Sequence, residues 1–235
     1  AHMARYGTTA EDFAAVAVSG RAHAARHPAA QMRDPITVED VLGSRMIADP
    51  LHLLDCSLVS DGGAAVVLTS AERTRDLPQA PVFLLGAGEG HRYEHISQSE
   101  DLTGSAAREA GEQAYAMAGI GPADIDIAQL YDCFTPTVLI ELEDLGFCAP
   151  GEGGAFLRSG ATLPGGSLPV NTHGGLLSHC HPGNPGSMFA LTESVLQLRH
   201  AAGERQVPGA ETVLAHAQGG IMSSHTTLIL GRERG

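Results

Sequence analysis

The sequence predicts a layered α/β protein, and the order of its segments from residue 81 onward is the main reason. Short apolar runs typical of strands alternate there with longer runs of helical spacing, which is the order that packs helices against a sheet. The composition agrees, because 43% of the 235 residues are apolar and 17% are charged, as in globular proteins. A chain of this length forms one large domain or two small ones.

The N-terminal stretch predicts a helix. Thr8 followed by Glu11 is typical of a helix start, and apolar residues at 13–17 supply one face. We expect this helix to end before Pro28, and the polar residues 29–49 to form an irregular excursion.

One further strand is expected before residue 81. The apolar run 64–69 follows an Asp-Gly-Gly turn and predicts a buried strand. The charged stretch 71–81 contains two prolines and predicts a linker between this strand and the rest of the chain.

From residue 82 onward, strands and helices are expected in alternation. We expect strands at 82–86, 125–130, 212–215 and 226–230, and helices at 106–118, 135–145 and about 188–203. Ser105 is a candidate N-cap of the first helix, and Gly119 and Gly146 are typical of helix ends. The run 125–130 alternates, as a half-buried strand does, and a glycine-rich loop is expected at 149–166.

Charge and composition exclude several classes of partner. The formal net charge of −13 argues against nucleic acid and anionic membranes as main partners. No apolar run reaches the roughly 20 residues of a membrane span, and the start lacks the pattern of a signal peptide. Four cysteines without a CxxC pair do not form a disulfide framework. We therefore expect a cytoplasmic protein with reduced thiols.

The first loop with chemical potential spans Tyr131–Thr135, where a strand gives way to a helix. The peptide dipoles at a helix start favour an anion and lower the pKa of a thiol. Cys133 is therefore a candidate acid/base or nucleophile. The alternative is that Cys133 is a small buried apolar residue.

The second loop runs from Asn171–Gly175 to His179–Gly183. Its glycines allow close approach of a ligand, and His181 is a candidate general base or hydrogen-bond donor. We expect no metal here, because three adjacent residues converge poorly on one tetrahedral zinc ion. His173 and His179, taken singly, are expected to be structural.

The third loop, His216–Gly220, follows an expected strand. Its glycines could offer a backbone N–H to a developing oxyanion, and a simple turn between strands is the alternative. All three loops lie at strand ends, where open α/β sheets gather their sites.

Four segments of this chain resemble motifs of the thiolase superfamily, in its sterol-carrier-protein-type or lipid-transfer-protein branch. Residues 53–65 resemble the thiolase strand-entry segment, and Tyr131–Phe134 resembles the HDCF motif. Cys180–Gly183 resembles the GHP motif, and His216–Gly220 resembles the C-terminal glycine loop. The motifs follow the family's order and spacing over nearly the whole chain.

The resemblance implies a thiolase-like fold of two βαβαβαββ halves. Residues 1–78 then correspond to the loop excursion and last strand of the first half, and residues 79–235 to the complete C-terminal half. The CxS loop with the family's nucleophilic cysteine is expected in the first half, outside these residues.

The resemblance also implies roles for the candidate residues. His181 is expected beside the acyl-thioester carbonyl, and Cys133 as the acid/base that moves an α-proton. Gly219 is expected to donate a backbone N–H to an oxyanion. The remaining expected substrate or oxyanion contacts are Gly220, His216, Asn171 and Gly174. The substrate is expected to be a coenzyme A thioester, with no further cofactor.

Three positions depart from the family pattern. Tyr131 replaces the histidine of HDCF, Cys180 replaces the glycine of GHP, and Gln218 lies in a C-terminal loop that has no cysteine. These changes are similar to those of thiolase-like proteins in lipid and steroid side-chain breakdown, some of which are retro-aldolases.

Three functions follow from the resemblance. The first is an acyltransferase acting on a fatty or steroid acyl-CoA, and the second is a retro-aldol lyase of a β-hydroxyacyl-CoA that uses Tyr131. The third is a non-catalytic subunit of such a complex. The expected partners are the missing half or a second copy of the chain, and a small OB-fold and zinc-ribbon protein.

Overall fold

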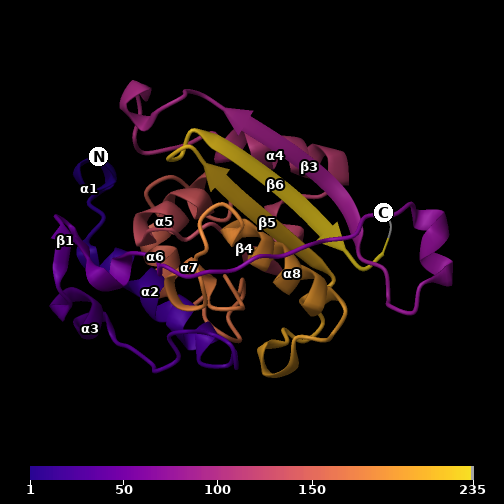
Figure 1. The fold of residues 1–235 in the computed structure, drawn as a ribbon. Helices are drawn as coiled ribbons and strands as arrows, with labels where there is room; N and C mark the ends of the chain where they lie inside the picture. The colour runs from indigo at the N-terminus through magenta and orange to yellow at the C-terminus, as the bar shows by residue number, and fades with distance from the viewer. Residues whose placement is uncertain (234–235) are drawn as a thin grey trace.

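A mixed four-stranded sheet lies at the centre of the computed structural model, which describes residues 1–233 (Figure 1). The strands, in sheet order, are β3 (Phe83–His91), β6 (Ser224–Gly231), β5 (Thr212–Gly219) and β4 (Ile127–Gln129). Strand β6 is antiparallel to both β3 and β5, and β4 is parallel to β5. A single parallel bridge between Ala128 and Val170 stands where the third strand of a βαβαβαββ unit is expected. The α/β fold is confirmed.

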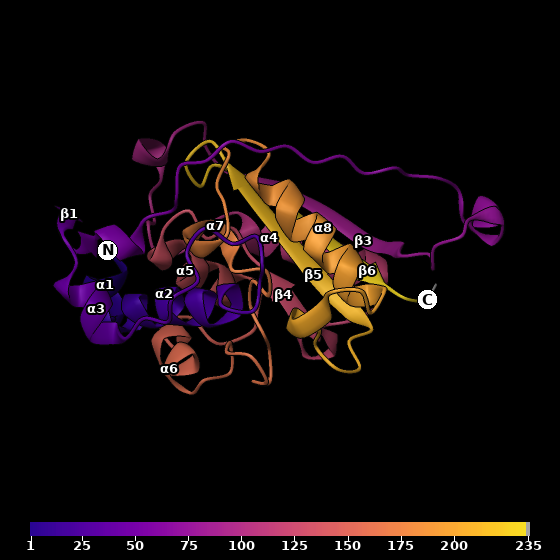
Figure 2. The ribbon, with the colours of Figure 1, turned by 60° about the horizontal axis from the view of Figure 1, so that its bottom comes forward.

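Helices cover both faces of this sheet. They are α4 (Ala107–Ala118), α5 (Thr135–Asp144), α6 (Gly153–Arg158), α7 (Gly175–Ser178) and α8 (Gly186–Leu198). Helices α4 and α5 lie on one face, and α8 lies along β5 on the other (Figure 2). Alternate strand residues fill the two cores, with Ala128, Leu214 and Ile229 towards α4 and α5, and Ile127, Val213 and Leu230 towards α8.

The strands lie where the sequence predicts them, with different limits and burial. Strands β3, β5 and β6 are longer than expected, and β4 is shorter. A strand forms within 125–130 as expected, but all three residues of β4 are buried, so the expectation that this strand is half-buried is wrong. Helices on both faces of the sheet remove the solvent-facing side that an alternating strand would need.

Close packing of β3 against α4 depends on glycine. A Cβ atom at Gly88 would lie 2.0 Å from the carbonyl oxygen of Ala110, and Gly86 and Gly90 approach α4 in the same way. Helix α4 ends at Gly119 in the left-handed conformation, as predicted. Its N-cap is Ala106, not the expected Ser105.

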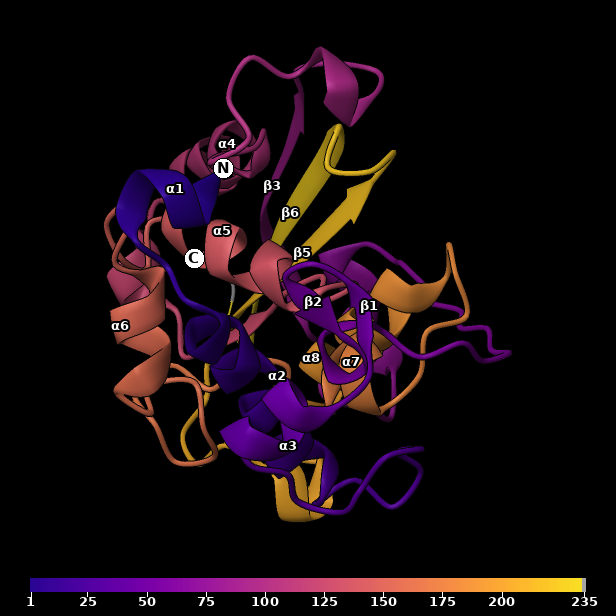
Figure 3. The ribbon, with the colours of Figure 1, turned by 90° about the vertical axis from the view of Figure 1, so that its left-hand side faces the viewer.

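The first part of the chain forms α1 (His2–Tyr6), α2 (Ala10–Ala24), α3 (Val38–Gly43), β1 (Met46–Ala48) and β2 (Leu51–His52). The expected start of α2 is one residue early, since Thr9 and Asp12 form its capping box: the Thr9 backbone N–H donates to Asp12 Oδ2 at 2.9 Å. Helix α2 packs against α5, α6 and α7, so it joins the core around α5 (Figure 3). Within residues 1–233, no helix has the length and hydropathy needed to cross a bilayer.

The strand expected at 64–69 is not formed. This run is extended but pairs with no strand among the described residues, and Val67 and Leu68 are 95% and 85% exposed. It belongs to the segment that crosses the α8 side of the molecule towards a short 3₁₀ helix at Ala71–Asp76 (Figure 2). The apolar pattern alone does not make a strand, because a strand needs a neighbour for its backbone hydrogen bonds.

Candidate active site

A cleft of about 650 Å³ opens at the edge of the sheet where the parallel strands β4 and β5 end. Its apolar lining comes from Leu51, Ile96, Phe134, Ile140, Ile221 and Met222. Tyr131, Cys133, Gln218 and Asn184 contribute polar groups, together with Gly219 and Gly220. The structure therefore brings the first and third candidate loops together, as their positions at strand ends predict.

Cys133 lies just before α5, with its sulfur between two polar side chains. Gln218 Nε2 donates to Cys133 Sγ at 3.2 Å, and Thr137 Oγ1 lies 3.6 Å from the same sulfur. Burial, with a smaller contribution from the nearby Glu141, raises the pKa of the Cys133 thiol to about 11. The expectation that the helix start lowers this pKa is wrong, because desolvation of the thiolate outweighs the peptide dipoles. Cys133 is a neutral thiol at neutral pH.

Tyr131 lines the cleft and is hydrogen-bonded to His181, which does not itself line it. The Tyr131 hydroxyl lies 3.2 Å from His181 Nε2, and His181 Nδ1 lies 2.8 Å from Ser57 Oγ. Burial raises the pKa of Tyr131 to about 12 and lowers the pKa of His181. Both groups are therefore neutral, so the phenol can donate to Nε2 while Nδ1–H donates to Ser57. This gives the phenol a proton acceptor already in place.

The extended segment 56–60 ties the first two loops together. The Ser57 backbone N–H donates to the Cys133 carbonyl at 3.0 Å, and the His181 backbone N–H donates to Ser60 Oγ at 2.8 Å. Sequence analysis gave Ser57 no role, although it lies in a segment that resembles a family motif. Nothing in the local sequence marks it, because its importance comes from the side chain it meets in the folded chain.

Asp132 lies between Tyr131 and Cys133 in the sequence, and its side chain binds the backbone of the second loop. Its carboxylate accepts hydrogen bonds from the backbone N–H groups of Leu176 and Leu177 at 2.7 and 3.2 Å. Burial raises its pKa to about 6, although these same bonds favour the charged form. Asp132 therefore fixes α7, and with it the approach to His181, relative to Cys133.

Asn171 and Gly174 do not line the cleft. Asn171 is buried and accepts a hydrogen bond from the Leu130 backbone N–H at 2.7 Å. Gly174 faces α2, where an added Cβ would lie 2.6 Å from the Cβ of Ala24. Both residues shape the second loop from inside the protein, and their expected contacts with substrate remain predictions.

His216 lies behind the cleft in a buried cluster with Glu141 and His225. His216 Nδ1 lies 2.8 Å from Thr227 Oγ1, and its Nε2 lies 3.0 Å from His225 Nδ1 and 3.8 Å from Glu141 Oε1. Burial lowers the pKa of His216 well below its usual value and raises that of Glu141 well above. The ligand atoms of the three residues lie within 4.8 Å of one another, which is close enough for a metal ion. Every ring nitrogen of the two histidines also has a hydrogen-bond partner in the protein.

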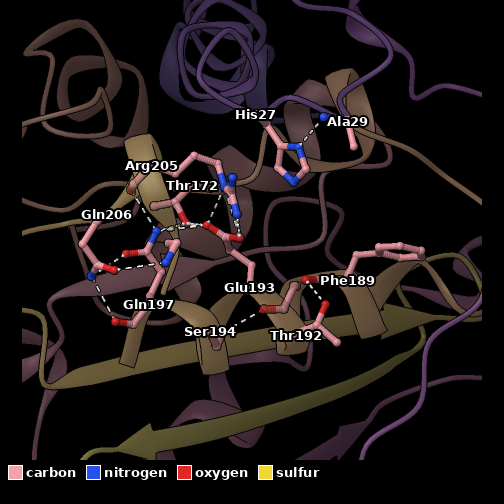
Figure 4. Close-up of polar contacts among 12 residues, drawn as sticks. His27, Ala29, Thr172, Phe189, Thr192, Glu193, Ser194, Gln197, Arg205 and Gln206 are labelled. Carbon is pink, nitrogen blue, oxygen red and sulfur yellow. Dashed lines mark hydrogen bonds and ion pairs between the residues drawn. The ribbon is translucent and has the colours of Figure 1, made fainter. Parts of the chain in front are cut away.

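A second polar network lies on the other face of the sheet, around Glu193 of α8 (Figure 4). Arg205 forms an ion pair with this carboxylate at 2.9 Å, and Thr172 and Gln197 donate to it at 3.0 and 2.9 Å. His173 is buried nearby, and burial lowers its pKa to about 3. None of these groups lines the cleft.

Residues 88–232 match the family model of the thiolase C-terminal domain-like proteins. The chain therefore belongs to the thiolase superfamily. Within that superfamily it lies in the sterol-carrier-protein-2-like branch, since it is 34% identical to the sterol carrier protein 2 of Rattus norvegicus over 93% of this chain and 41% of that protein.

Relatives with higher identity carry two kinds of name. The chain is 45% identical to a steroid side-chain-cleaving aldolase of Thermomonospora curvata, over 99% of this chain and 60% of the relative. It is 44% identical to 17-hydroxy-3-oxo-4-pregnene-20-carboxyl-CoA lyase of Mycobacterium tuberculosis, over 98% and 60%. An acetyl-CoA acetyltransferase of Methanothermobacter thermautotrophicus is 40% identical over 98% and 61%. The chain thus spans about 60% of the length of these relatives.

Solved structures agree with the sequence relatives. The Ltp2-ChsH2(DUF35) aldolase superposes with a TM-score of 0.92 at 43% identity, covering 100% of this chain and 61% of that one. A monomeric SCP2-thiolase-like protein of Mycobacterium smegmatis gives a TM-score of 0.75 at 26% identity, covering 100% and 50%. The thiolase-like fold expected from the sequence is confirmed.

Proposed function

We propose that this chain carries the C-terminal part of the active site of a retro-aldol lyase, which cleaves a β-hydroxyacyl-CoA thioester. The observation that carries the proposal is the hydrogen bond between Tyr131 and His181 at the cleft. Tyr131 stands where the family motif has a histidine, and its phenol has a proton acceptor in His181. The names of the relatives at 45% and 44% identity support a lyase in preference to the acyltransferase that sequence analysis placed first.

The first step removes the proton of the substrate's β-hydroxyl group. A phenol with a pKa of about 12 is a weak base, so Tyr131 passes its own proton to His181 Nε2 as its oxygen takes the hydroxyl proton. The β-carbon becomes a carbonyl, the bond between the α- and β-carbons breaks, and its electron pair forms the enolate of the thioester.

The second step returns a proton to carbon. The neutral Cys133 thiol donates its proton to the α-carbon of the enolate, which releases a shortened acyl-CoA and a ketone or aldehyde. Gln218 Nε2–H, 3.2 Å from the sulfur, then stabilises the thiolate. Proton exchange with solvent returns the Cys133 thiolate and the His181 imidazolium to their neutral forms. A backbone N–H of Gly219 is our candidate donor to the enolate oxygen.

An acyltransferase is the second candidate function. It is favoured by the 40% identity to an acetyl-CoA acetyltransferase and by the position of His181 beside the Cys133 loop. This reaction needs a nucleophilic cysteine from outside these residues, because Cys133 is protonated at neutral pH and the cleft has no second thiol among the described residues.

The substrate and partner follow from the same cleft and comparisons. The apolar lining suits a fatty or steroid acyl group. The reaction requires the coenzyme A thioester of the substrate and no further cofactor. An accessory protein of the OB-fold and zinc-ribbon kind is proposed as partner, supported by the paired name of the Ltp2-ChsH2(DUF35) aldolase.

The test compares two variants of the complete protein on a β-hydroxyacyl-CoA and on the matching β-ketoacyl-CoA. Tyr131→Phe removes the proton route, so we expect it to lower cleavage of the β-hydroxy substrate at least about 100-fold. The matched control is Tyr115→Phe, since the Tyr115 hydroxyl donates to the Leu145 carbonyl and does not line the cleft. Wild-type cleavage by Tyr131→Phe would refute the lyase mechanism. A larger loss from Cys133→Ala, seen on the β-keto substrate, would favour the acyltransferase.

A further inference from the structure

The loop between β5 and β6 holds three consecutive residues in the left-handed conformation. The φ angles of Gly220, Ile221 and Met222 are 58°, 58° and 61°. For residues with a side chain this conformation costs roughly 1 kcal/mol or more each, so surrounding contacts must hold it. This loop forms one wall of the cleft, so the contacts that hold the loop also determine the shape of the cleft.

Met222 is held through both of its backbone polar groups. Its N–H donates to Gln218 Oε1 at 2.6 Å on the cleft side, and its carbonyl lies 3.1 Å from His225 Nε2 on the buried side. Met222 thus connects the cleft residue Gln218 with a buried histidine that does not reach the cleft.

The proton positions on the buried side are determined by this contact. A carbonyl oxygen only accepts, so His225 Nε2 must donate to Met222. Burial lowers the pKa of His225 to about 4, so the ring is neutral and its Nδ1 accepts. His216 Nε2 must therefore donate to His225 Nδ1 at 3.0 Å, and His216 Nδ1 accepts from the Thr227 hydroxyl at 2.8 Å.

The orientation of the Gln218 amide is determined in the same way. The Met222 N–H only donates, so the oxygen of the Gln218 amide must face it. The nitrogen then faces Cys133 Sγ at 3.2 Å. All donors from Thr227 to Gln218 therefore point in one direction, towards the thiol.

We propose that His225 is a positioning residue for the cleft: supported by His216, it holds the Gly219–Met222 loop so that Gln218 donates its amide N–H to Cys133. This role concerns the geometry around the thiol and holds for a lyase and for an acyltransferase alike. Its test can therefore fail or succeed independently of the proposed reaction.

The first measurement is the alkylation rate of Cys133 by iodoacetamide at pH 9, followed by mass spectrometry of the Cys133 peptide in the complete protein. The thiolate is the reactive form, and a hydrogen bond to a charged group is worth about 1.5–3 kcal/mol. Losing the Gln218 bond should therefore slow alkylation roughly tenfold or more in His225→Leu. His225→Gln keeps an N–H at the position of Nε2 and should stay within about twofold of wild type.

Two further variants separate positioning from general loss of structure. If His225 acts through Gln218, His225→Leu should have no further effect in a Gln218→Met background. His23→Leu is the matched control, since His23 is equally buried but bonds the Thr162 carbonyl, away from this loop. An unchanged or faster rate in His225→Leu, additive effects in the double variant, or an equal effect of His23→Leu would overturn the proposal.

A second measurement tests the hydrogen-bond direction itself. Nitrogen NMR of the histidine rings should show the Nε2–H form for both His216 and His225 at pH 7. An Nδ1–H signal from either ring would overturn the proposal, and so would a stoichiometric metal ion that is lost in His225→Leu.

Discussion

Two glutamates are buried on opposite faces of the same sheet, and their surroundings shift their pKa values in opposite directions. Burial raises the pKa of Glu193, but the bonds from Arg205 and Gln197 outweigh it and leave the pKa below its usual value. Within residues 1–233, Glu141 forms no ion pair with a lysine or arginine, and burial raises its pKa well above the usual value. Its closest hydrogen-bond donor is the backbone N–H of Tyr131 at 3.0 Å.

The network around Glu193 supports the structure, whereas the network around Glu141 is connected to the cleft. On the α8 face, a charged pair holds Arg205 and Thr172 in place and lies away from the cleft. On the α5 face, a carboxyl group with a raised pKa stands beside histidines whose hydrogen bonds lead to the cleft loop. The raised pKa of Glu141 opposes a negative charge on this carboxyl group, which lies close to the Cys133 thiol.

The largest effect should come from breaking the charged pair. Arg205→Met leaves Glu193 buried without its cation, which typically costs about 3–5 kcal/mol. We expect a loss of this size in the free energy of unfolding, measured by urea denaturation. Arg199→Met is the control, because the half-buried Arg199 side chain donates to the neutral Ala80 carbonyl, and its loss should cost less than about 1 kcal/mol. A loss below about 1 kcal/mol in Arg205→Met would contradict the role of the ion pair.

An intermediate effect is expected from a matched pair of threonines. Thr172 donates to the charged Glu193, whereas Thr227 donates to the neutral His216. Thr→Val keeps the shape in both cases, so Thr172→Val should cost about 1.5–3 kcal/mol and Thr227→Val about 0.5–1.5 kcal/mol. Equal losses in the free energy of unfolding, measured by urea denaturation, would show that the two networks do not differ in charge.

The smallest effect should come from Glu141→Gln measured below about pH 4, where the wild-type carboxyl group is protonated in both the folded and the unfolded protein. A carboxyl group whose pKa is raised in the folded state stabilises fully below its unfolded pKa of about 4.5. This contribution is lost as the pH rises towards the folded pKa. The stability of wild type should therefore fall more than that of Glu141→Gln as the pH rises above about 4.5, the usual pKa of the carboxyl group. Parallel stability profiles for the two proteins would place a charged Glu141 in the core.

Local sequence signals predicted the framework of the fold and of the cleft. Gly119 ends α4 because a left-handed residue there needs no partner from elsewhere in the chain. Tyr131, Cys133 and Gly219 meet because strand ends on one edge of a sheet converge. The strand expected at 64–69 failed for the opposite reason, since strand formation depends on a second segment that supplies hydrogen bonds.

The properties that sequence could not predict depend on contacts made only after folding. The local sequence shows the helix start beside Cys133, which predicts a lowered pKa, but it does not show the burial that raises this pKa to about 11. Ser57 and His225 carry no local mark, and Gln218 was noted only as a missing cysteine. Ser57 and Gln218 each become informative through a hydrogen bond to a residue far away in the sequence, and His225 through a bond to Met222 that depends on the folded β5–β6 turn.

The pairing of β5 with β6 sets a limit on how this cleft can change in size. His216 stands opposite Thr227, and Gln218 stands opposite His225. Leu214 and the other core residues fix which side of each strand faces α5, so the pairing can slip only by two residues, or about 7 Å. A slip of two residues would break the pairing of His216 with Thr227 and of Gln218 with His225. Residues inserted in the 220–223 turn must therefore extend into solvent and leave the register unchanged. Protein engineers who wish to widen the cleft for larger acyl groups should therefore lengthen the 92–106 connection, which supplies Ile96 to the same lining.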